Sequence, residues 1–468
     1  MPKLTFDGLM NDSSGQIGRA LEAACAFLKG APKADLLRQV GATIESVPQA
    51  PHADKRWFQK SFGRGTPAGP DLVSGLGLFY VTEDRRLYLD CTAGHYQMTW
   101  GYAHPALVAL VRDGQKRGIV WDNHSNIPSG PVKRLSAKLV EIANAGKRSP
   151  DEAQNDANSL NTVLLGVCTG TVACAAALKM SLVHYWQEKA SAGAPVFVVL
   201  DGNYHGTDFL AQRLRGMWPQ VFAGFEVAAV QPNDGGELEA TFKRYGERIA
   251  AFWAEPIMMN REAILVRADY VRLARQLCDR TGALMAIDEI QTGFWYPEVM
   301  MYRQYDIEPD FVVLGKGMTA GFHPLSALLY RGKLDRLEQY DAISTNGNAS
   351  LAAYVGLGCT ALVEKNARRI GTIGRYYHKK MAGLCEEFPD LLQEVRGLGH
   401  LTALKFHRRE DALGFHRSAV QRGLWVRAHA YHEGHSAVLT KFALLLDREV
   451  ADFAIGVFRQ LLQDRPWR

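Results

Sequence analysis

The chain has 468 residues, of which 47% are hydrophobic and 22% are charged, as is typical of a soluble globular enzyme. Its 54 basic and 49 acidic residues give a net charge of +5 without a basic run, which argues against a nucleic-acid partner. No apolar stretch of about 18 residues predicts a membrane span, residues 1–16 lack the layout of a signal peptide, and the scattered cysteines include no CxxC pair, so we expect a cytoplasmic protein with reduced thiols.

The first 161 residues predict only a few regular elements. Residues 17–30 have a helical pattern, and residues 76–94 predict a β-hairpin with the polar sequence TEDRR as its turn. The polar stretch 145–161 predicts a surface loop or a disordered insertion.

From residue 162 onward, short apolar runs alternate mostly with helix-like stretches. This alternation predicts a mainly parallel α/β sheet that is covered by helices. The predicted strands are TVLLGV (162–167), PVFVVLD (195–201), EVAAVQ (226–231), IAAFWAEP (249–256), ALMAIDE (283–289) and DFVVLGK (310–316). A long helical pattern follows at 349–366, and then a short α+β segment with candidate strands at 395–407 and 436–446.

Polar residues stand where these predicted strands end, and ligands of such sheets bind beyond the carboxyl ends of the strands. They are Thr169–Thr171, Tyr204, Glu255, Asp288 and Lys316. The threonines open an alanine-rich helix, whose N-terminal N–H groups suit a phosphate. Taken singly, the threonines could be an ordinary helix cap, and Lys316 could lie in a solvated Gly-Lys-Gly turn. Five polar strand ends in chain order favour a common ligand site.

An amine, a buried carboxylate, an aromatic ring and a phosphate-binding helix N-terminus together indicate pyridoxal phosphate. Lys316 would form a Schiff base with the aldehyde of this cofactor. Burial would lower the pKa of the Lys316 amine and so make it a usable nucleophile and base. Asp288 would keep the pyridine nitrogen protonated, and Tyr204 would stack on the ring.

At these residues the chain resembles the class III aminotransferases of the fold-type I pyridoxal phosphate enzymes, over roughly residues 70–465. The similar segments are LYLDCTAGHYQMTWGYAHPALVALV (87–111), CTGTVACAAALKM (168–180), GNYHG (202–206), AEPI (254–257), DEIQTGF (288–294), GKG (315–317) and STNGNASLAA (344–353). The resemblance implies a seven-stranded, mainly parallel sheet in a large domain, and a smaller α+β domain from both chain ends. The expected boundaries are an N-terminal extension (1–60), the first part of the small domain (61–125), the large cofactor-binding domain (126–348) and the C-terminal small domain (349–468).

The resemblance also implies roles for single residues. Lys316 would carry the cofactor, Asp288 would pair with the pyridinium, and Gln291 would bond the phenolic oxygen. The remaining cofactor-binding residues would be Gly170 and Thr171 at the phosphate, Tyr204 on the ring, Glu255 beside it, and Thr345 at the phosphate of the neighbouring subunit. His205 is a further candidate for contact with the ring, with a structural role as the alternative. We therefore expect a homodimer with composite active sites.

The sequence departs from the family pattern mainly in the substrate half of the site. The usual Glu of the phosphate helix is Val172, and EPIQGEGG becomes EPIMMNREA, so that Met258, Met259, Asn260 and Arg261 replace a Gln, a Gly, a Glu and a Gly. GFGRTG becomes GFWYPE, which introduces Trp295 and Tyr296. If these bulky residues face the cofactor, they would form an apolar substrate pocket.

The arginine that often binds the substrate carboxylate is also missing. The nearest basic residue in SAVLTKFALLL is Lys441, which we interpret as a solvated strand residue, and Arg261 is the one candidate replacement. We therefore expect a substrate with a sizeable apolar or aromatic portion, and not a simple dicarboxylic amino acid.

The predicted function is transfer of an amino group from an amine or amino acid to a keto acid or aldehyde, without nucleic-acid or membrane partners. Because the substrate half of the pattern has changed, a racemase, an aminomutase or a decarboxylase on the same scaffold is the alternative. A cofactor-free binding protein on a decayed enzyme fold is the hypothesis from another class, and the presence of Lys316, Asp288 and Gln291 argues against it.

Overall fold

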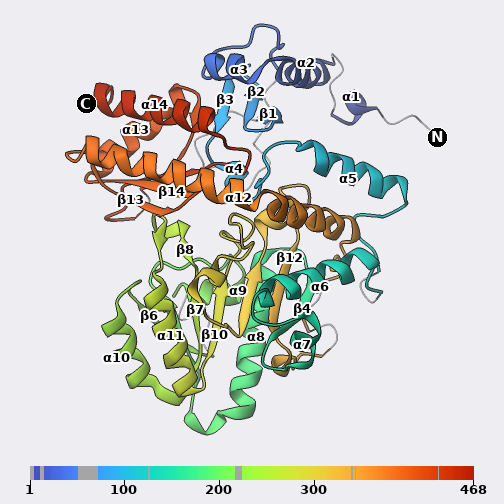
Figure 1. The fold of residues 1–468 in the computed structure, drawn as a ribbon, viewed down its shortest axis with the longest axis vertical. Helices are drawn as coiled ribbons and strands as arrows, with labels where there is room; N and C mark the ends of the chain where they lie inside the picture. Colours follow the sequence, from blue (N-terminus) through green and yellow to red (C-terminus); the bar gives the residue numbers. More distant parts are fainter. Residues whose placement is uncertain are drawn as a thin grey trace.

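The computed structural model describes residues 5–10, 15–50, 72–124, 127–216, 224–338, 341–342, 344–430 and 432–468. A large domain forms the lower half of Figure 1, and a smaller domain forms the upper half. No helix in the described part of the chain is long and apolar enough to cross a membrane.

The large domain is built around one seven-stranded sheet, in the order β4–β12–β11–β10–β7–β5–β6. Strand β12 is antiparallel to both of its neighbours, and the other paired strands are parallel. The strands are β4 (Leu160–Val167), β5 (Val196–Leu200), β6 (Glu226–Val230), β7 (Ile249–Ala254), β10 (Leu284–Asp288), β11 (Phe311–Leu314) and β12 (Ser326–Arg331). The predicted fold class is confirmed, and all six predicted strands are present. The sequence analysis did not identify β12.

The central strands are apolar throughout because both faces of the sheet are buried. Along β5, Phe197 and Val199 pack in the cluster that contains helix α8, whereas Val198 and Leu200 pack in the cluster that contains the helices of the opposite face. Helix α8 spans Gly170–Glu188, and the helices of the opposite face are α6 (Gly130–Asn144), α10 (Gly235–Tyr245) and α11 (Ala268–Thr281). The short α9 (Phe209–Leu214) packs on α8, and β8 (Ile257–Met258) pairs with β9 (Ile264–Leu265).

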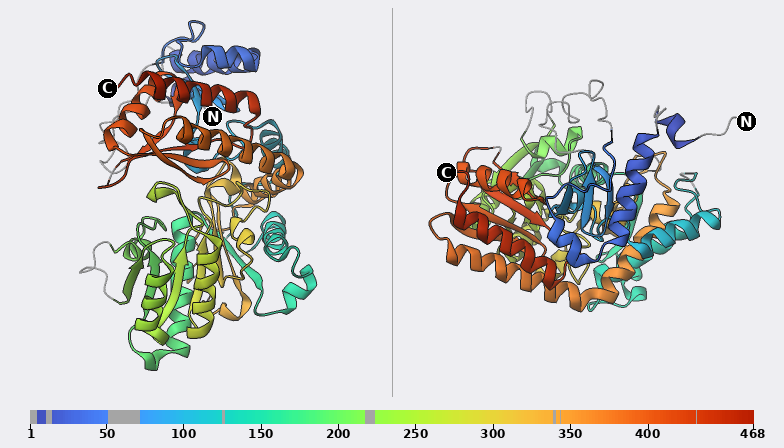
Figure 2. Two further views of the ribbon diagram at one scale, coloured as in Figure 1. Left: turned by 60° about the vertical axis from the view of Figure 1, so that its left-hand side comes forward. Right: turned by 90° about the horizontal axis from the view of Figure 1, so that it is seen from above.

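The smaller domain contains an antiparallel sheet in the order β13–β14–β17–β16. Its strands are β13 (Leu392–Leu398), β14 (Leu401–Phe406), β16 (Arg427–His429) and β17 (Ala437–Lys441), and its helices are α12 (Ser350–Glu387), α13 (Arg409–Gln421) and α14 (Arg448–Asp464). The long helix α12 contacts β13 and α14 of this domain and also α6 of the large domain (Figure 2). The candidate strand at 436–446 contains β17, but the candidate strand at 395–407 is two strands, the end of β13 and β14, joined by a turn at Gly399 and His400.

The N-terminal part of the chain joins the smaller domain through a second sheet, β1–β2–β3–β15. Strand β15 (Leu424–Trp425) pairs in parallel with β3 (Leu87–Asp90), which brings both ends of the chain into one domain, as expected. The predicted hairpin is β2 (Phe79–Thr82) with β3, and the predicted helix is α2 (Gln16–Gly30). The other elements are α1 (Phe6–Leu9), α3 (Lys33–Gln39), β1 (Leu72–Leu76), α4 (Ala93–Tyr96) and α5 (Pro105–Lys116).

Residues 145–161 differ from the predicted loop. They contain helix α7 (Pro150–Asn155) and the first residues of β4. The Ser149 hydroxyl accepts a hydrogen bond from the Glu152 N–H, and the Glu152 carboxylate accepts one from the Ser149 N–H, so the pair forms a capping box. A proline at the first helical position supports the same start. These helix signals are present in the sequence, but the high polarity of the segment favoured the prediction of a loop.

Candidate active site

A cavity of about 570 Å³ lies beyond the carboxyl ends of the sheet strands. Six of the predicted site residues line it: Gly170, Thr171, Tyr204, His205, Gln291 and Lys316. Asp288 and Glu255 are buried directly behind this lining, since Asp288 bonds His205 and Glu255 bonds Gln291. Thr345 is exposed and does not line the cavity of its own chain. The structure therefore brings eight of the nine predicted residues together.

Lys316 follows β11 in a strained backbone conformation. Its φ of +36° lies in the left-handed region, which is unfavourable for a residue with a side chain and is often found at functional sites. At Gly317, an added Cβ would lie 2.6 Å from Thr99, so only glycine allows this close approach. Burial lowers the pKa of the Lys316 amine, and the charges of Asp288 and Glu255 partly oppose this shift. Lys316 can therefore supply a neutral, nucleophilic amine more readily than an exposed lysine.

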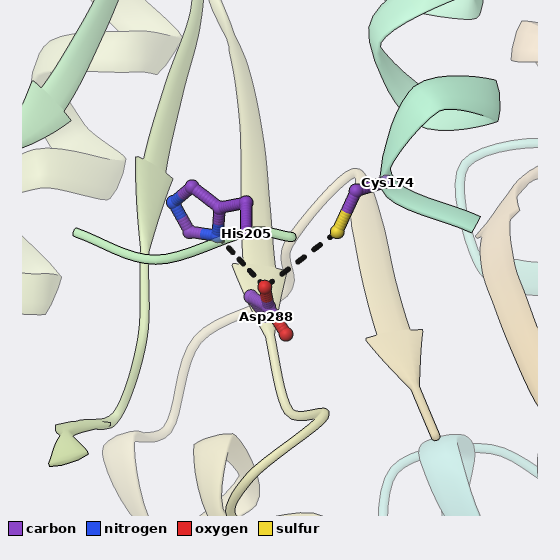
Figure 3. A group of neighbouring side chains, drawn as sticks. All are labelled: Cys174, His205 and Asp288. Carbon is purple, nitrogen blue, oxygen red and sulfur yellow. Dashed lines mark hydrogen bonds and ion pairs between the residues drawn. The ribbon is translucent and has the colours of Figure 1, made fainter. Parts of the chain in front are cut away.

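Asp288 ends β10, and its side chain lies between those of His205 and Cys174 (Figure 3). Its Oδ2 accepts a hydrogen bond from Nδ1 of His205 at 2.7 Å and a longer one from the Cys174 thiol at 3.6 Å. Its Oδ1 accepts from the N–H of Ile290 at 2.9 Å. The three side chains are close enough to hold a metal ion. Burial raises the pKa of the Cys174 thiol well above its usual value, so the sulfur stays protonated and acts as a donor.

Glu255 and Gln291 form a buried polar network beside the cavity. Glu255 accepts hydrogen bonds from the N–H of Tyr204 at 2.8 Å and from Nε2 of Gln291 at 3.0 Å. Gln291 Nε2 also donates to Asn260 at 3.1 Å, so both amide hydrogens have acceptors and a ligand can bond only its carbonyl oxygen. The pKa of Glu255 is raised to about 7, mainly by burial. The nearby His205 opposes this rise, and the charge of Asp288 adds to it.

The N-terminus of α8 lies at the cavity, and its first N–H groups are not capped by the Thr169 side chain. The Thr171 hydroxyl is already engaged: it donates to Asp208 at 2.7 Å and accepts from the N–H groups of Thr207 and Asp208. A Cβ at Gly206 would lie 2.1 Å from this hydroxyl oxygen, so the loop packs tightly on α8. An anion here would be bound mainly by backbone N–H groups.

The bulky residues that replace the family pattern do not line the cavity. Met258, Met259, Trp295 and Tyr296 all pack in the hydrophobic core, and the Tyr296 hydroxyl donates to the Leu398 carbonyl at 2.9 Å. The condition for an apolar substrate pocket built from these side chains is therefore not met. Large apolar residues beside a domain boundary gain more by filling the core than by lining a wet cavity.

The two basic candidates for a substrate clamp also differ from expectation. Arg261 pairs with Asp201 at 2.8 Å and donates to Gln231 at 2.8 Å, so its guanidinium is already engaged. Lys441 is not solvated: its side chain is fully buried, and its Nζ lies 3.5 Å from the ring centroid of Tyr96. The Lys316 amine lies 5.7 Å from the same centroid.

Two groups near the site were not found from the sequence. Cys174 belongs to the quoted phosphate helix, but its bond to Asp288 depends on how α8 packs on the sheet. Arg427, whose charge acts on Lys316, comes from the C-terminal segment and donates to His95 at 2.6 Å. The basic, histidine-rich run at 427–435 is the only local signal for this second group.

Residues 67–462 match the sequence model of the family described as aminotransferase class-III. The chain is a class-III aminotransferase. Among its relatives, the acetylornithine aminotransferase of Xylella fastidiosa (strain 9a5c) is 30% identical over 348 residues, which cover 70% of this chain and 77% of the relative. The mitochondrial ornithine aminotransferase of Oryza sativa subsp. japonica is 30% identical over 344 residues, or 70% of this chain and 68% of the relative. The putrescine aminotransferase of Pectobacterium atrosepticum is 26% identical over 72% of this chain and 71% of the relative.

Solved structures show the same fold. A transaminase from the marine bacterium Virgibacillus superposes with a TM-score of 0.75 at 19% identity and covers 88% of this chain and 97% of its own. The ornithine aminotransferase from Toxoplasma gondii ME49 superposes with a TM-score of 0.73 at 21% identity, over 87% of this chain and 93% of its own. The family membership means that this class-III aminotransferase is an enzyme that transfers amino groups, and members of the family use pyridoxal phosphate.

Proposed function

We propose that the cavity around Lys316 binds pyridoxal 5'-phosphate and that the enzyme uses it to move an amino group from an amine or amino acid to a keto acid or aldehyde. The observation that carries this proposal is the pair of Lys316 and Asp288 at one cavity. The amine has a lowered pKa, and the carboxylate is fixed on both oxygens by donors. Pyridoxal phosphate enzymes need this pair together with a helix N-terminus for the phosphate and an aromatic residue for the ring.

The residues fit the cofactor in size and chemistry. The cavity of about 570 Å³ is large enough for a molecule of this kind, and the uncapped first turn of α8 supplies donors for its phosphate. Only glycine fits at position 170, since a Cβ there would lie 2.5 Å from the Ile290 side chain. Tyr204 would contact the ring, and Gln291 would accept a hydrogen bond from the ring hydroxyl.

When bound, pyridoxal phosphate supplies an aldehyde that condenses with amines and a ring that withdraws electrons. Lys316 would hold the cofactor covalently, and its amine, when free, would serve as the base that takes a proton from the donor carbon. Asp288 would keep a positive charge on the ring nitrogen, because an ionised carboxylate favours a protonated partner. His205 holds Asp288 in place, and Glu255 holds both Gln291 and the backbone of Tyr204.

We also propose a cytoplasmic homodimer in which each chain completes the site of its partner. The support is Thr345, which is exposed at the turn before α12 and does not reach the cavity of its own chain. The resemblance to the family assigns this residue to the phosphate of the neighbouring subunit.

The proposed reaction is tested by screening amines and amino acids with keto acid and aldehyde acceptors. The screen measures the keto product, the aminated product, the chirality of the donor and released CO₂. Amino-group transfer with a stoichiometric keto product is the expected result. A racemised or rearranged donor, or CO₂ without an aminated product, would identify the alternative reactions on the same scaffold. A colourless protein that binds no pyridoxal phosphate would contradict the proposal as a whole.

A further inference from the structure

A second cavity of about 650 Å³ lies beside the first one. The two share a wall at two places. Asn260 lines the second cavity and bonds Gln291, which lines the first. Arg215 lines the second cavity and lies 5.1 Å from the ring centroid of Tyr204, which lines the first. A ligand in the second cavity would therefore be next to the reacting centre.

The lining of the second cavity is strongly basic. Among the described residues, it contains four arginines, Arg213, Arg215, Arg261 and Arg427, but only two carboxylates, Asp201 and Glu433. Asp201 is paired with Arg261, and Arg213 donates to the Phe225 carbonyl. Arg215 and Glu433 are exposed, whereas Arg427 is partly buried.

Among the arginines of this cavity, Arg427 is the one whose charge acts on Lys316, and no ion pair links it to a carboxylate in the part of the chain that the structure describes. Within the described residues, its Nη1 donates to Nδ1 of His95 at 2.6 Å, and its Nε is buried without an acceptor. Burial and the charges of Lys441 and Arg427 lower the pKa of His95 to about 2, so this histidine is neutral and accepts the bond. Arginine cannot give up its proton in a protein, so the guanidinium keeps its full charge.

The surroundings of Arg427 add positive charge instead of removing it. Burial has the largest effect on the neighbouring Lys441 amine and lowers its pKa, and the charge of Arg427 lowers it further. The charge of Arg427 also lowers the pKa of Lys316. The carboxylate that favours the charged form of Lys441 is Asp90, whose oxygens already accept from Thr92, Gly94 and Tyr102. A partly buried charge without a counter-ion is costly, and an anion from outside would offset this cost.

We infer that the second cavity receives an acidic group, carboxylate or phosphate, of the amino donor or acceptor, and that Arg427 is the residue that binds it. This inference rests on the proposed function and narrows its substrate class. A guanidinium offers two parallel N–H bonds to either acid, which a lysine such as Lys441 cannot do. The substrate would enter past Arg215, place its acidic group on Arg427 and direct its amine or carbonyl group toward Lys316.

The test compares wild type, Arg427→Gln and the control Arg422→Gln with pairs of donors that differ only in the acid. Arg422 is exposed and lines neither cavity, so its variant loses the same charge elsewhere. The pairs are 5-aminopentanoate with 5-aminopentanamide, and phosphoethanolamine with ethanolamine. For the acidic member, Arg427→Gln should raise KM about tenfold to a hundredfold, the usual effect of losing a charged hydrogen bond. For the neutral member, kcat/KM should change less than about twofold.

A binding measurement separates this inference from the proposed function. Calorimetry of the holoenzyme with glutarate and with inorganic phosphate, neither of which carries an amine, reports the anion site without turnover. The expected result is weaker binding of one or both anions to Arg427→Gln and unchanged binding to Arg422→Gln. Weaker binding of glutarate would identify the acidic group as a carboxylate, and weaker binding of inorganic phosphate would identify it as a phosphate. Unchanged binding of both anions, or an equal loss of activity for acidic and neutral donors, would overturn the role of Arg427. If the wild-type enzyme transfers the amino group of no donor, the proposed function is contradicted. The calorimetry still shows in that case whether Arg427 binds an anion.

Discussion

His205 and Asp288 are joined by a short buried hydrogen bond behind the proposed cofactor site, with Nδ1 of the ring 2.7 Å from Oδ2 of the carboxylate. Both side chains are almost fully buried, and the ring packs edge-on against Trp253. The histidine therefore fixes the position of the carboxylate behind the cavity. This contact has consequences for both residues.

Asp288→Asn should lower kcat by a factor of about 100 to 1,000, as the loss of a preorganised charge typically does. His205→Phe should give a smaller loss, because Asp288 keeps its charge but loses a donor. His205→Asn can still donate from its amide and should recover part of the loss. The measurement is kcat for one donor, with the absorbance spectrum as a check on bound cofactor. Near-normal turnover of Asp288→Asn would show that the carboxylate has another role.

Lys316→Ala should abolish amino-group transfer, because no other amine lines the cavity among the described residues. Borohydride reduction of the wild type, followed by digestion and mass spectrometry, should place the pyridoxyl group on the peptide that contains Lys316. Lys365→Ala, which removes an exposed amine on α12, is the matched control and should stay fully active. A pyridoxyl group on any other lysine would refute the assignment.

Thr345→Ala should weaken the binding of pyridoxal phosphate if the threonine completes the partner's site. A mixture of this variant with Lys316→Ala should form some dimers with one intact site, and activity should depend on the mixing ratio. Sedimentation gives the oligomeric state, and cofactor titration gives the affinity. A fully active monomer would contradict the composite site.

Glu262→Gln should destabilise the protein by about 3–5 kcal/mol, the usual cost of breaking a buried ion pair. Both Glu262 oxygens lie 2.8 Å from Nζ of Lys405, one of them lies 3.1 Å from Nη1 of Arg396, and all three side chains are mostly buried. The pair joins the β8–β9 segment of the large domain to β14 of the smaller domain. Glu394→Gln removes the exposed partner of Arg396 and should cost less than about 1 kcal/mol. Urea unfolding measures both, and equal midpoints for the two variants would show that the buried pair contributes little.

Glu289 should make stability fall as pH rises. Burial raises its pKa to about 7, and hydrogen bonds from Thr292 and Tyr302 oppose the shift. Between its ordinary pKa of 4.5 and about 7, the unfolded chain has released this proton while the folded chain keeps it, so the unfolded state binds fewer protons and stability decreases with pH.

Glu289→Gln has no proton to release at this position, so its stability should not show this part of the decrease. Between pH 5 and 8, its free energy of unfolding should therefore rise relative to that of the wild type by up to about 3 kcal/mol. Urea midpoints at pH 5, 6, 7 and 8 measure the gain, and the exposed Glu247→Gln is the control. A constant difference between variant and wild type across this range would contradict the raised pKa.

The local sequence carried much of the fold. Runs such as 195–201 and 283–289 are apolar on both faces, which identifies strands covered by helices on two sides. Strand β12 was missed because it follows a short connection after Lys316 and runs antiparallel, outside the expected strand–helix alternation. Helix α7 was not predicted because its segment is polar and has no apolar periodicity, and the helix is stabilised mainly by its N-terminal capping box.

The amino-acid sequence alone identifies Tyr204, Asp288 and Lys316 as polar residues at strand ends. Because the carboxyl ends of parallel strands meet at one edge of the sheet, these residues could be placed in one site. Their neighbours in that site depend on tertiary packing. The pairing of Arg261 with Asp201, the burial of Lys441 under Tyr96 and the approach of Arg427 to Lys316 all join segments far apart in the chain. The first two contacts depend on how distant segments pack within one domain, and the third depends on how the smaller domain packs on the large one. The periodicity of a single segment contains no information about that packing.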